Sequence, residues 1–266
     1  MPARYPERIV CLTEETTETL YLLGEERRIV GISGYTVRPP RARKEKPRVS
    51  AFLSADTGKI VELKPDLVIG FSDLQAEILR ELAKAGLNVL VFNQRSVEEI
   101  LSMILTLSSI VGAAGRGQRL VAQLEANLQS IRDAAKALAR RPRVYFEEWD
   151  EPMISAIRWV SELVEIAGGE DVFAEQSHSQ AARGRIVTSE AVVQRRPEIV
   201  IASWCGKKFR PERVAARPGW REIPAVQTGE LHEVKSAEIL QPGPAALTDG
   251  VRRLHSLFAA FVSSSR

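Results

Sequence analysis

The chain has 266 residues, of which 44% are hydrophobic and 27% are charged. This length and composition suit one or two globular domains with sizeable apolar cores. The net charge of +3, from 37 basic and 34 acidic residues, is too small to predict binding to nucleic acid. No apolar run reaches the roughly 18 to 20 residues that a membrane-spanning helix needs, so we expect a chain that does not span a membrane.

The first residues contain no apolar secretory segment. Met1–Arg8 are mostly polar or proline, and an apolar strand follows them directly. We therefore expect a cytoplasmic protein for the sequence as it stands, or a periplasmic one if an export signal was removed. Cys11 and Cys205 stand far apart and outside any metal-type spacing, so we expect two reduced thiols.

Short apolar runs alternate with helical patterns in the first part of the chain. We predict strands at 9–12, 29–32, 67–69 and 89–92, and a helix from about 74 to 85. This alternation indicates an α/β fold with a mainly parallel sheet flanked by helices.

A long helical stretch follows without any strand signal. Ser96 can cap a helix that runs to about Val111, and the pattern is helical again from about 118 to 140. We expect the glycines at 112, 115 and 117 to interrupt this stretch, and Pro142 to end it. The stretch predicts one long rigid helix that joins two lobes.

The alternation resumes after Pro142, with strands predicted at 144–146 and 199–201 and helices from about 159 to 167 and 244 to 261. Residues 61–69 and 193–201 also share a pattern, because in each an amphipathic helix ends at basic-Pro-acidic and a buried strand follows. We therefore predict two α/β lobes and a link, namely an N-terminal lobe of residues 1–112, a linking helix of residues 113–141 and a C-terminal lobe of residues 142–266.

Aromatic residues recur where the predicted strands end. Ligands of open parallel sheets lie beyond the carboxyl ends of the strands. The chain has only four Trp, four Tyr and eight Phe, and five of these lie just after strands or in neighbouring loops: Tyr35, Phe52, Phe71, Trp149 and Trp204. The pattern indicates a binding surface for a broad, partly apolar ligand. The alternative is that these rings cap the cores of the lobes.

The sequence carries no catalytic signature such as H-E-x-x-H, G-x-S-x-G or a P-loop. The acidic run at 147–151 is compatible with acid–base or metal chemistry, but we interpret it as a solvated loop. Cys205 with His178 is a weak candidate for a nucleophile–base pair. We therefore expect a protein that is not an enzyme, with no catalytic residue, no metal site and no covalently bound cofactor.

Two groups of basic residues stand out. One lies between Arg38 and Arg48, and the other comprises Lys207, Lys208, Arg210 and Arg213. Each group is either a solvated loop face or a surface that attracts an anionic ligand.

Five segments together suggest a family: 9–13 with Thr17 and Glu18, 30–35, 63–69, 162–169 and 196–201. Through them the chain, from Arg8 to about Phe261, resembles the cobalamin- and ferric-siderophore-binding proteins of ABC importers, and most closely their cobalamin-binding branch. The resemblance implies two lobes joined by one rigid helix, with a corrinoid held in the cleft between them by aromatic residues of both lobes.

The resemblance also implies site residues. Tyr35, Phe52 and Phe71 fall where the first lobe of that family contacts its ligand, and Trp149 and Trp204 are the second-lobe candidates. The predicted ligand contacts also include three polar residues, namely Glu15, Arg185 and Glu238.

Members of that family dock on their transporter through one acidic residue per lobe. Glu77 matches the first of these positions. Leu240 occupies the second, so Glu238 is the nearby candidate.

Several functions stay open at this point. The first is a corrinoid carrier for uptake or intracellular handling, acting as a monomer with an ABC permease as partner and without nucleic acid. The second is a binder of a ferric siderophore, haem or another anionic metal chelate. The third is an enzyme of the related nitrogenase-like or chelatase-like folds, which would need Cys205 at the cleft. The fourth is a protein-interaction module that docks through Arg38–Arg48.

Overall fold

The computed structural model describes residues 5–264 and contains two compact units. The N-terminal lobe consists of the chain up to Gln94 and of Glu98–Gln123, and the C-terminal lobe consists of Arg95–Val97 and the chain from Leu124 onward. The ends of the predicted domains, residues 1–4 and 265–266, lie outside the described residues. None of the helices between residues 5 and 264 combines the length and the apolar character that crossing a membrane requires.

Five parallel strands form the sheet of the N-terminal lobe, in the order β3-β2-β1-β4-β5. Every residue of the central strands β1 and β4 is buried, as expected for a parallel sheet with both faces covered. The four strands predicted in this lobe are confirmed. The fifth, β3, gives no sequence signal because it is short and holds one apolar residue between two polar ones. The strands are β1 (Ile9–Cys11), β2 (Ile29–Ser33), β3 (Arg48–Ser50), β4 (Leu67–Phe71) and β5 (Val89–Phe92).

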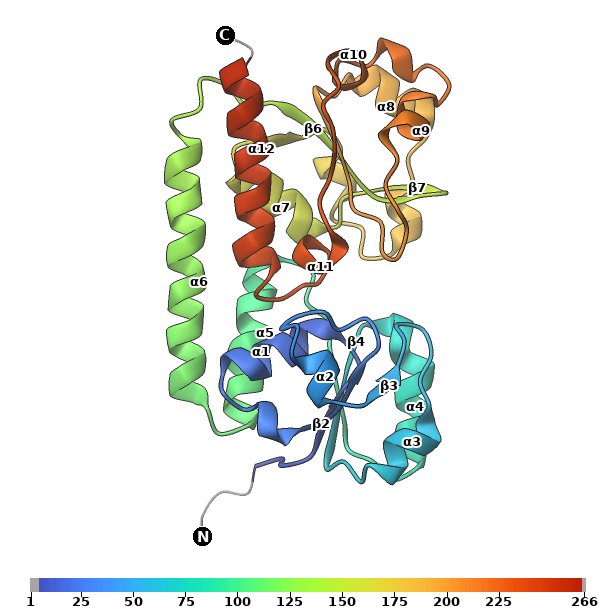
Figure 1. The fold of residues 1–266 in the computed structure, drawn as a ribbon, viewed down its shortest axis with the longest axis vertical. Helices are drawn as coiled ribbons and strands as arrows, with labels where there is room; N and C mark the ends of the chain where they lie inside the picture. Colours follow the sequence, from blue (N-terminus) through green and yellow to red (C-terminus); the bar gives the residue numbers. More distant parts are fainter. Residues whose placement is uncertain (1–4, 265–266) are drawn as a thin grey trace. The chain divides into compact units, whose positions relative to one another are not determined.

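Helices cover both faces of this sheet. Figure 1 shows α3 and α4 on one side of the strands, and α1 and α5 on the other. On the first side, Ile60 of α3 and Leu79 and Leu82 of α4 pack against Val10 and Val68 of the sheet. The helices are α1 (Glu14–Leu22), α2 (Ala42–Glu45), α3 (Thr57–Glu62), α4 (Ala76–Lys84) and α5 (Val97–Ile110), with 3-10 turns at Glu26–Arg28 and Asp73–Gln75.

One helix of 22 residues, α6 (Ala114–Ala135), carries the chain from the first lobe into the second. It begins before the predicted start at 118 and ends before the predicted end at 140. Gly115 and Gly117 therefore lie inside it instead of interrupting it. Gly117 is needed for packing, because a Cβ there would lie 1.9 Å from the Oγ of the buried Ser108 in α5.

Each half of α6 is attached to its own lobe. In the first half, Arg116 forms an ion pair with Glu25 at the end of the α1 segment. In the second half, the side-chain amide of Asn127 donates to the backbone oxygen of Leu247, at 2.7 Å. The helix is therefore part of the packing of both lobes.

The sheet of the C-terminal lobe has the order β10-β9-β6-β7, with β8 also paired to β6. All its pairings are parallel except that of β7, which returns beside β6 as an antiparallel hairpin. The predicted mainly parallel α/β architecture is thus confirmed in both lobes. The strands are β6 (Arg143–Asp150), β7 (Met153–Ser155), β8 (Glu170–Asp171), β9 (Ile199–Ala202) and β10 (Leu231–Glu233).

The hairpin corrects one prediction from the sequence. The acidic run at 147–151 is not a solvated loop, because β6 continues through it to Asp150 and Glu147 is fully buried. The charge of Glu147 is balanced by Arg217. The two residues are so far apart in the chain that the local sequence pattern does not reveal this ion pair.

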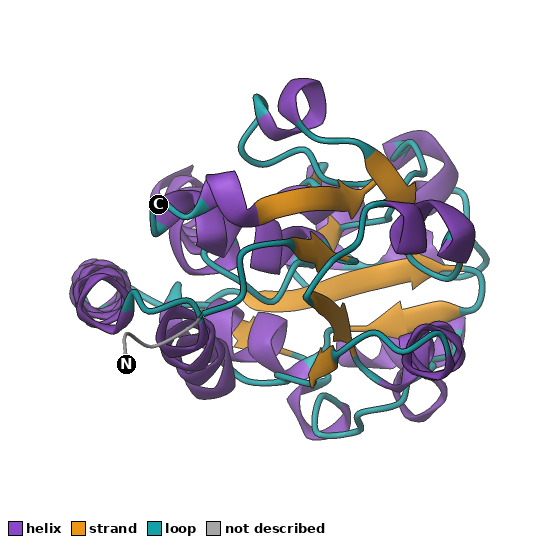
Figure 2. Ribbon diagram, turned by 90° about the horizontal axis from the view of Figure 1, so that it is seen from below, coloured by secondary structure: helices purple, strands orange, loops and turns teal. Residues whose placement is uncertain are grey.

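The helices of the C-terminal lobe enclose an aromatic core. The ring of Tyr145 makes edge-to-face contacts with Phe173 and Trp220, at centroid distances of 5.6 and 6.1 Å. Figure 2 shows helices on both sides of the strands. The helices are α7 (Arg158–Ile166), α8 (Ser189–Arg195), α9 (Pro211–Ala215), α10 (Pro224–Thr228), α11 (Ser236–Ile239) and α12 (Val251–Ser264), with 3-10 turns at Ala174–Gln176, Ala182–Arg185 and Trp220–Glu222 and a π-helical turn at Ala246–Gly250.

The close approach of α5 and α6 predicts opposite effects for two neighbouring glycines. Gly117→Ala should lower the urea midpoint, because the new methyl group would overlap Ser108. Gly115→Ala should leave the midpoint unchanged or raise it, by up to about 1 kcal/mol in stability, because its Cβ would meet nothing closer than 3.9 Å and alanine favours a helix. Equal effects of the two changes would refute the packing argument.

Candidate functional site

Four exposed apolar side chains follow strands β2, β3 and β4 of the N-terminal lobe. Tyr35 follows β2, Phe52 and Leu53 follow β3, and Leu74 follows β4, with exposed fractions of 45%, 36%, 67% and 56%. Because the strands are parallel, these segments lie at the same edge of the sheet. Large apolar side chains that gather in the open usually mark a binding surface. We call these four residues the apolar edge.

A buried amide lies beneath the apolar edge. The order of the strands reverses between β1 and β4, and ligands of open α/β sheets bind at such a reversal. Gln75, which is completely buried, accepts a hydrogen bond from the backbone N–H of Phe71 at 2.9 Å. Its side-chain amide donates to the backbone oxygens of Phe52, at 3.0 Å, and of Leu12, at 3.5 Å. Gln75 therefore joins the segments that follow β1, β3 and β4.

The segment after β4 is tightly constrained. Phe71 is only 5% exposed, so its ring lies within the lobe. Ser72 has a φ of 59°, which is uncommon for a residue other than glycine. Its N–H donates to the oxygen of Phe92 at 2.8 Å, and its hydroxyl accepts from the N–H of Leu74 at 3.2 Å. Backbone strain of this kind is often found at binding sites.

Three carboxyl groups stand at the start of α1, directly after β1. Burial raises the pKa of Glu15 to about 7, although the Thr13 hydroxyl donates to it at 2.6 Å and opposes this rise. Burial, together with the charges of Glu15 and Glu18, raises the pKa of Glu14 to about 8, against the opposing charge of Arg43. Glu15 is 1% exposed and therefore lies beneath the surface of the lobe. Its predicted ligand contact stays a prediction.

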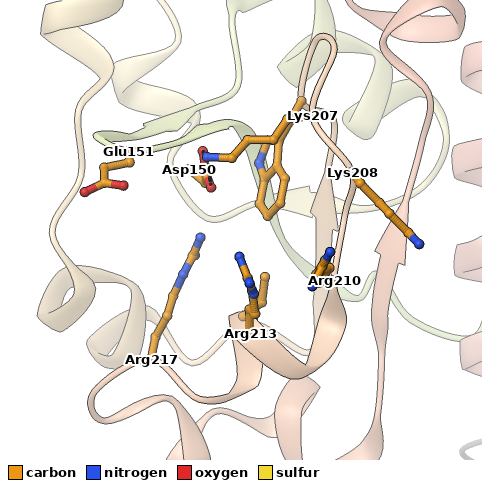
Figure 3. Close-up of a pocket in the computed structure, with 9 residues that line it drawn as sticks. Asp150, Glu151, Lys207, Lys208, Arg210, Arg213 and Arg217 are labelled. Carbon is orange, nitrogen blue, oxygen red and sulfur yellow. Dashed lines mark hydrogen bonds and ion pairs between the residues drawn. The ribbon is translucent and has the colours of Figure 1, made fainter.

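A pocket of about 330 Å³ lies at the carboxyl ends of β6 and β9 in the C-terminal lobe. Its lining combines the second basic group of the sequence with two carboxylates and a buried tryptophan. We call it the basic pocket, and it is lined by Asp150, Glu151, Trp204, Lys207, Lys208, Arg210, Arg213, Val214 and Arg217 (Figure 3).

Two of the five cations are neutralised within the lobe. The Lys207 ammonium lies 2.6 Å from Asp150 and 5.4 Å from the ring centroid of Trp149. Arg217 binds both oxygens of Glu147, at 2.6 and 2.9 Å. The side chains of the other three, Lys208, Arg210 and Arg213, form no ion pair or hydrogen bond with residues 5–264.

Arg217 is held in place by a buried network. Glu147 also accepts a hydrogen bond from the hydroxyl of Tyr145, at 3.0 Å. Burial raises the pKa of Glu147, and the hydrogen bonds and charge of Arg217 oppose the rise. Without Arg217 the buried carboxylate of Glu147 would lack its counter-charge, which would strongly destabilise the fold. Arg217 is therefore held in a fixed position in the wall of the basic pocket.

The two predicted tryptophans of the C-terminal lobe differ in exposure. Trp204 is 8% exposed and stacks edge-to-face on Phe209, at a centroid distance of 5.5 Å. Its indole N–H is buried and has no hydrogen-bond partner among residues 5–264. Trp149 is half-buried, and its indole donates to the oxygen of Glu151 at 2.9 Å. The contact of these rings with a ligand stays a prediction.

The remaining predicted residues lie apart from the basic pocket lining. Arg185 is buried, where its guanidinium pairs with Glu148 and donates to the oxygen of Ser155 at 2.7 Å. Glu238 is half-buried in α11. Glu77 is on the surface of α4, with 80% of its side chain exposed and Arg80 at 2.5 Å.

Two arginines of the first basic group have acidic partners. Arg38 pairs with Glu18 at 2.8 Å, and Arg41 pairs with Glu26 at 3.2 Å. The guanidinium of Arg41 also lies 4.8 Å from the centre of the Tyr21 ring. These two pairs join the basic loop to α1 and to the 3-10 turn at Glu26–Arg28.

Metal and thiol chemistry have no assembled site in the described part of the chain. No group of three or more His, Cys, Asp or Glu side chains between residues 5 and 264 is arranged to hold a metal ion. Both cysteines are free thiols. Cys11 is buried, and burial raises its pKa to about 12, whereas Cys205 is exposed.

Comparison with known proteins identifies relatives along nearly the whole chain. The model of a family described as "Periplasmic binding protein" matches residues 9–238. An uncharacterized ABC transporter substrate-binding lipoprotein, YvrC of Bacillus subtilis, is 26% identical over 94% of this chain and 79% of its own length. A vitamin B12-binding protein of Vibrio cholerae is 28% identical over 91% of this chain and 85% of its own length.

Solved structures share the fold. The periplasmic heme-binding protein RhuT of Roseiflexus sp. RS-1 superposes with a TM-score of 0.82 and 24% identity, over 98% of this chain and 99% of its own. The periplasmic vitamin B12-binding protein BtuF of Vibrio cholerae superposes with a TM-score of 0.76 and 24% identity, over 96% of this chain and 98% of its own. The predicted resemblance is thereby confirmed. So is the expectation that the protein is not an enzyme, since the matched family consists of solute-binding proteins.

The buried carboxyl of Glu15 predicts how stability depends on pH. Its folded pKa of about 7 lies above the usual 4.5 of a glutamate, so the folded state keeps a proton that the unfolded state loses as the pH rises between these values. The contribution of Glu15 to stability should therefore fall from about pH 5 to pH 7, and that of Glu14, whose pKa is about 8, should fall up to about pH 8. Glu15→Gln should remove the Glu15 part of this loss, which is at most about 3 kcal/mol, and leave a smaller decline with pH. Thermal unfolding at pH 5 and pH 8 tests this, with the exposed Glu62→Gln as the control. A Glu15→Gln variant with the wild-type pH profile would contradict it.

The hydrogen bonds of Gln75 predict a second effect on stability. Gln75→Met keeps the length of the side chain but leaves the N–H of Phe71 and the oxygen of Phe52 without partners. We expect a loss of about 2 to 4 kcal/mol in the free energy of unfolding, measured in urea. Gln129→Met on the exposed surface of α6 is the control and should cost less than about 0.5 kcal/mol. Similar losses in both variants would show that Gln75 does not hold the edge together.

Proposed function

Because the chain belongs to the periplasmic binding protein family, we propose that it is the substrate-binding component of an ABC importer and that its ligand is a corrinoid of the cobalamin type. The apolar edge is the observation that carries the ligand assignment. A corrinoid has a broad, partly apolar face, and each aromatic side chain that it covers contributes roughly 1 to 3 kcal/mol through burial of apolar area.

Relatives support a corrinoid as the first candidate. Proteins named for vitamin B12 or cobalamin binding match 90% or more of this chain in Vibrio and Halobacterium, at 24 to 28% identity. The edge of this lobe offers two exposed rings, Tyr35 and Phe52, at strand ends where a flat ligand can be covered. The position of the ligand in a cleft between the lobes stays a prediction.

Docking on a permease is part of the same proposal. The lipoprotein YvrC is named as the substrate-binding part of an ABC transporter, and this supports a permease partner and a place outside the cytoplasm. Glu77 is the proposed docking residue of the N-terminal lobe, since its carboxylate is well exposed on α4. Glu238, which is half-buried, is the proposed residue of the C-terminal lobe.

A second candidate ligand is an anionic metal chelate, such as haem or a ferric siderophore. The basic pocket favours it, because five cations line this pocket and only two carboxylates do. The heme-binding protein RhuT, which shares the fold, is an example of a relative with such a ligand.

Calorimetric titration with cyanocobalamin and with cobinamide tests the corrinoid assignment. We expect binding at or below micromolar concentration. Tyr35→Ala and Phe52→Ala should each weaken it by about fivefold to hundredfold, because each removes buried apolar area. Tyr5→Ala is a matched control, since Tyr5 is 43% exposed but precedes β1, at the opposite edge of the sheet. If neither compound gives heat or raises the melting temperature, the ligand is not a corrinoid.

A further inference from the structure

The basic pocket carries unbalanced positive charge. Lys207 is paired with Asp150, and Arg217 is paired with Glu147. Three cations remain without a partner in the described part of the chain, and Glu151 is the one carboxylate of the lining outside these pairs. Like charges held around one pocket repel each other, so an anion placed among them is stabilised.

The arginine side chains are directed at the same space. Figure 3 shows Arg213 and Arg217 extending from the α9 side toward the region beneath Lys207 and Asp150, with Arg210 beside them and Lys208 directed away. Since Arg217 is fixed by Glu147, the free guanidinium groups at this space are those of Arg210 and Arg213. A guanidinium group binds a carboxylate or a phosphate with two parallel hydrogen bonds, which gives both strength and orientation.

The size of the pocket limits what it can hold. A volume of about 330 Å³ is at the lower end of the range for sites that enclose a whole small molecule. It suits a peripheral arm of a larger chelate. Trp204 lines the same pocket, and its buried indole N–H has no hydrogen-bond partner among residues 5–264.

The first basic group of the chain offers a comparison. Arg38 and Arg41 are each paired to a glutamate there, and Arg43, Lys44 and Arg48 are exposed. At the basic pocket, Asp150 pairs with Lys207 and Glu147 pairs with Arg217, and Arg210 and Arg213 line the same pocket with no side-chain partner among residues 5–264. The charge excess is therefore concentrated where the pocket is.

We propose that Arg210 and Arg213 form a subsite that binds an anionic arm, carboxylate or phosphate, of the transported chelate. This inference rests on the proposed function only in assigning the anion to the transported ligand. It narrows the ligand class, because a chelate with a free oxyanion would be preferred over the same chelate with that group esterified.

The test compares haem, which has two carboxylates, with its dimethyl ester. Absorbance titration of the full chain should show tighter binding of haem than of the ester. The double variant Arg210→Gln/Arg213→Gln should weaken haem binding by about tenfold to hundredfold and change ester binding by less than about threefold. The variant Arg183→Gln/Arg253→Gln removes the same charge from exposed arginines of this lobe that do not line the pocket, and should bind haem like the wild type.

Titration with inorganic pyrophosphate tests the subsite independently of the transport function. Calorimetry at low salt should detect pyrophosphate binding to the wild type and to the control variant, but not to Arg210→Gln/Arg213→Gln. If haem and cyanocobalamin both fail to bind while pyrophosphate binding depends on the two arginines, the proposed function is wrong and the subsite stands.

Two results would overturn the subsite. One is haem binding that is equal in the wild type and in Arg210→Gln/Arg213→Gln, which would leave the transport function intact. The other is the absence of any effect of these arginines on either haem or pyrophosphate, which would assign the charges to another role, such as contact with an acidic protein surface.

Discussion

Parallel hydrogen bonding of β1 to both β2 and β4 is the constraint on which the N-terminal lobe depends. Parallel strands must all end at the same edge, and each needs a helical crossover to return to its start. Segments that are distant in the sequence therefore meet at the carboxyl edge. The exposed Tyr35, Phe52 and Leu74 come together for this reason, and the helices on both faces leave that edge as the open surface of the sheet.

The two lobes repeat this architecture but use the edge differently. The N-terminal edge is apolar above a buried amide, whereas the C-terminal edge has a pocket with excess positive charge. Both depend on buried polar groups that fix the surface groups: Gln75 ties three segments together in one lobe, and Glu147 fixes Arg217 in the other. Such groups are stable only if their hydrogen bonds are satisfied, so they also fix the geometry of what lies above them.

Much of the fold could be predicted from the sequence. Buried parallel strands such as those at 67–69 and 199–201 are continuous apolar runs. In the crossover helices, apolar residues recur every three to four positions. Strands β3 and β7 could not be predicted, because Arg48–Ser50 and Met153–Ser155 are short and their pairing depends on neighbours elsewhere in the chain. The exposure of the predicted site residues could not be read from the sequence. Tyr35 and Phe52 are exposed at strand ends, whereas Phe71 and Trp204, chosen by the same rule, are buried in their lobes because packing around each strand end differs.

The sequence by itself determined the fold class and the positions of most strand ends, because hydrophobic periodicity is a local property of the chain, and the resemblance of five segments to known binding proteins indicated the family. Only the tertiary structure decided which polar and charged groups are free. Two basic groups look alike in the sequence, yet Arg38 and Arg41 are paired with glutamates, whereas the side chains of Arg210 and Arg213 have no such partner among residues 5–264. Pairing of charges depends on distances between residues far apart in the chain, and those distances exist only once the sheets and helices have packed.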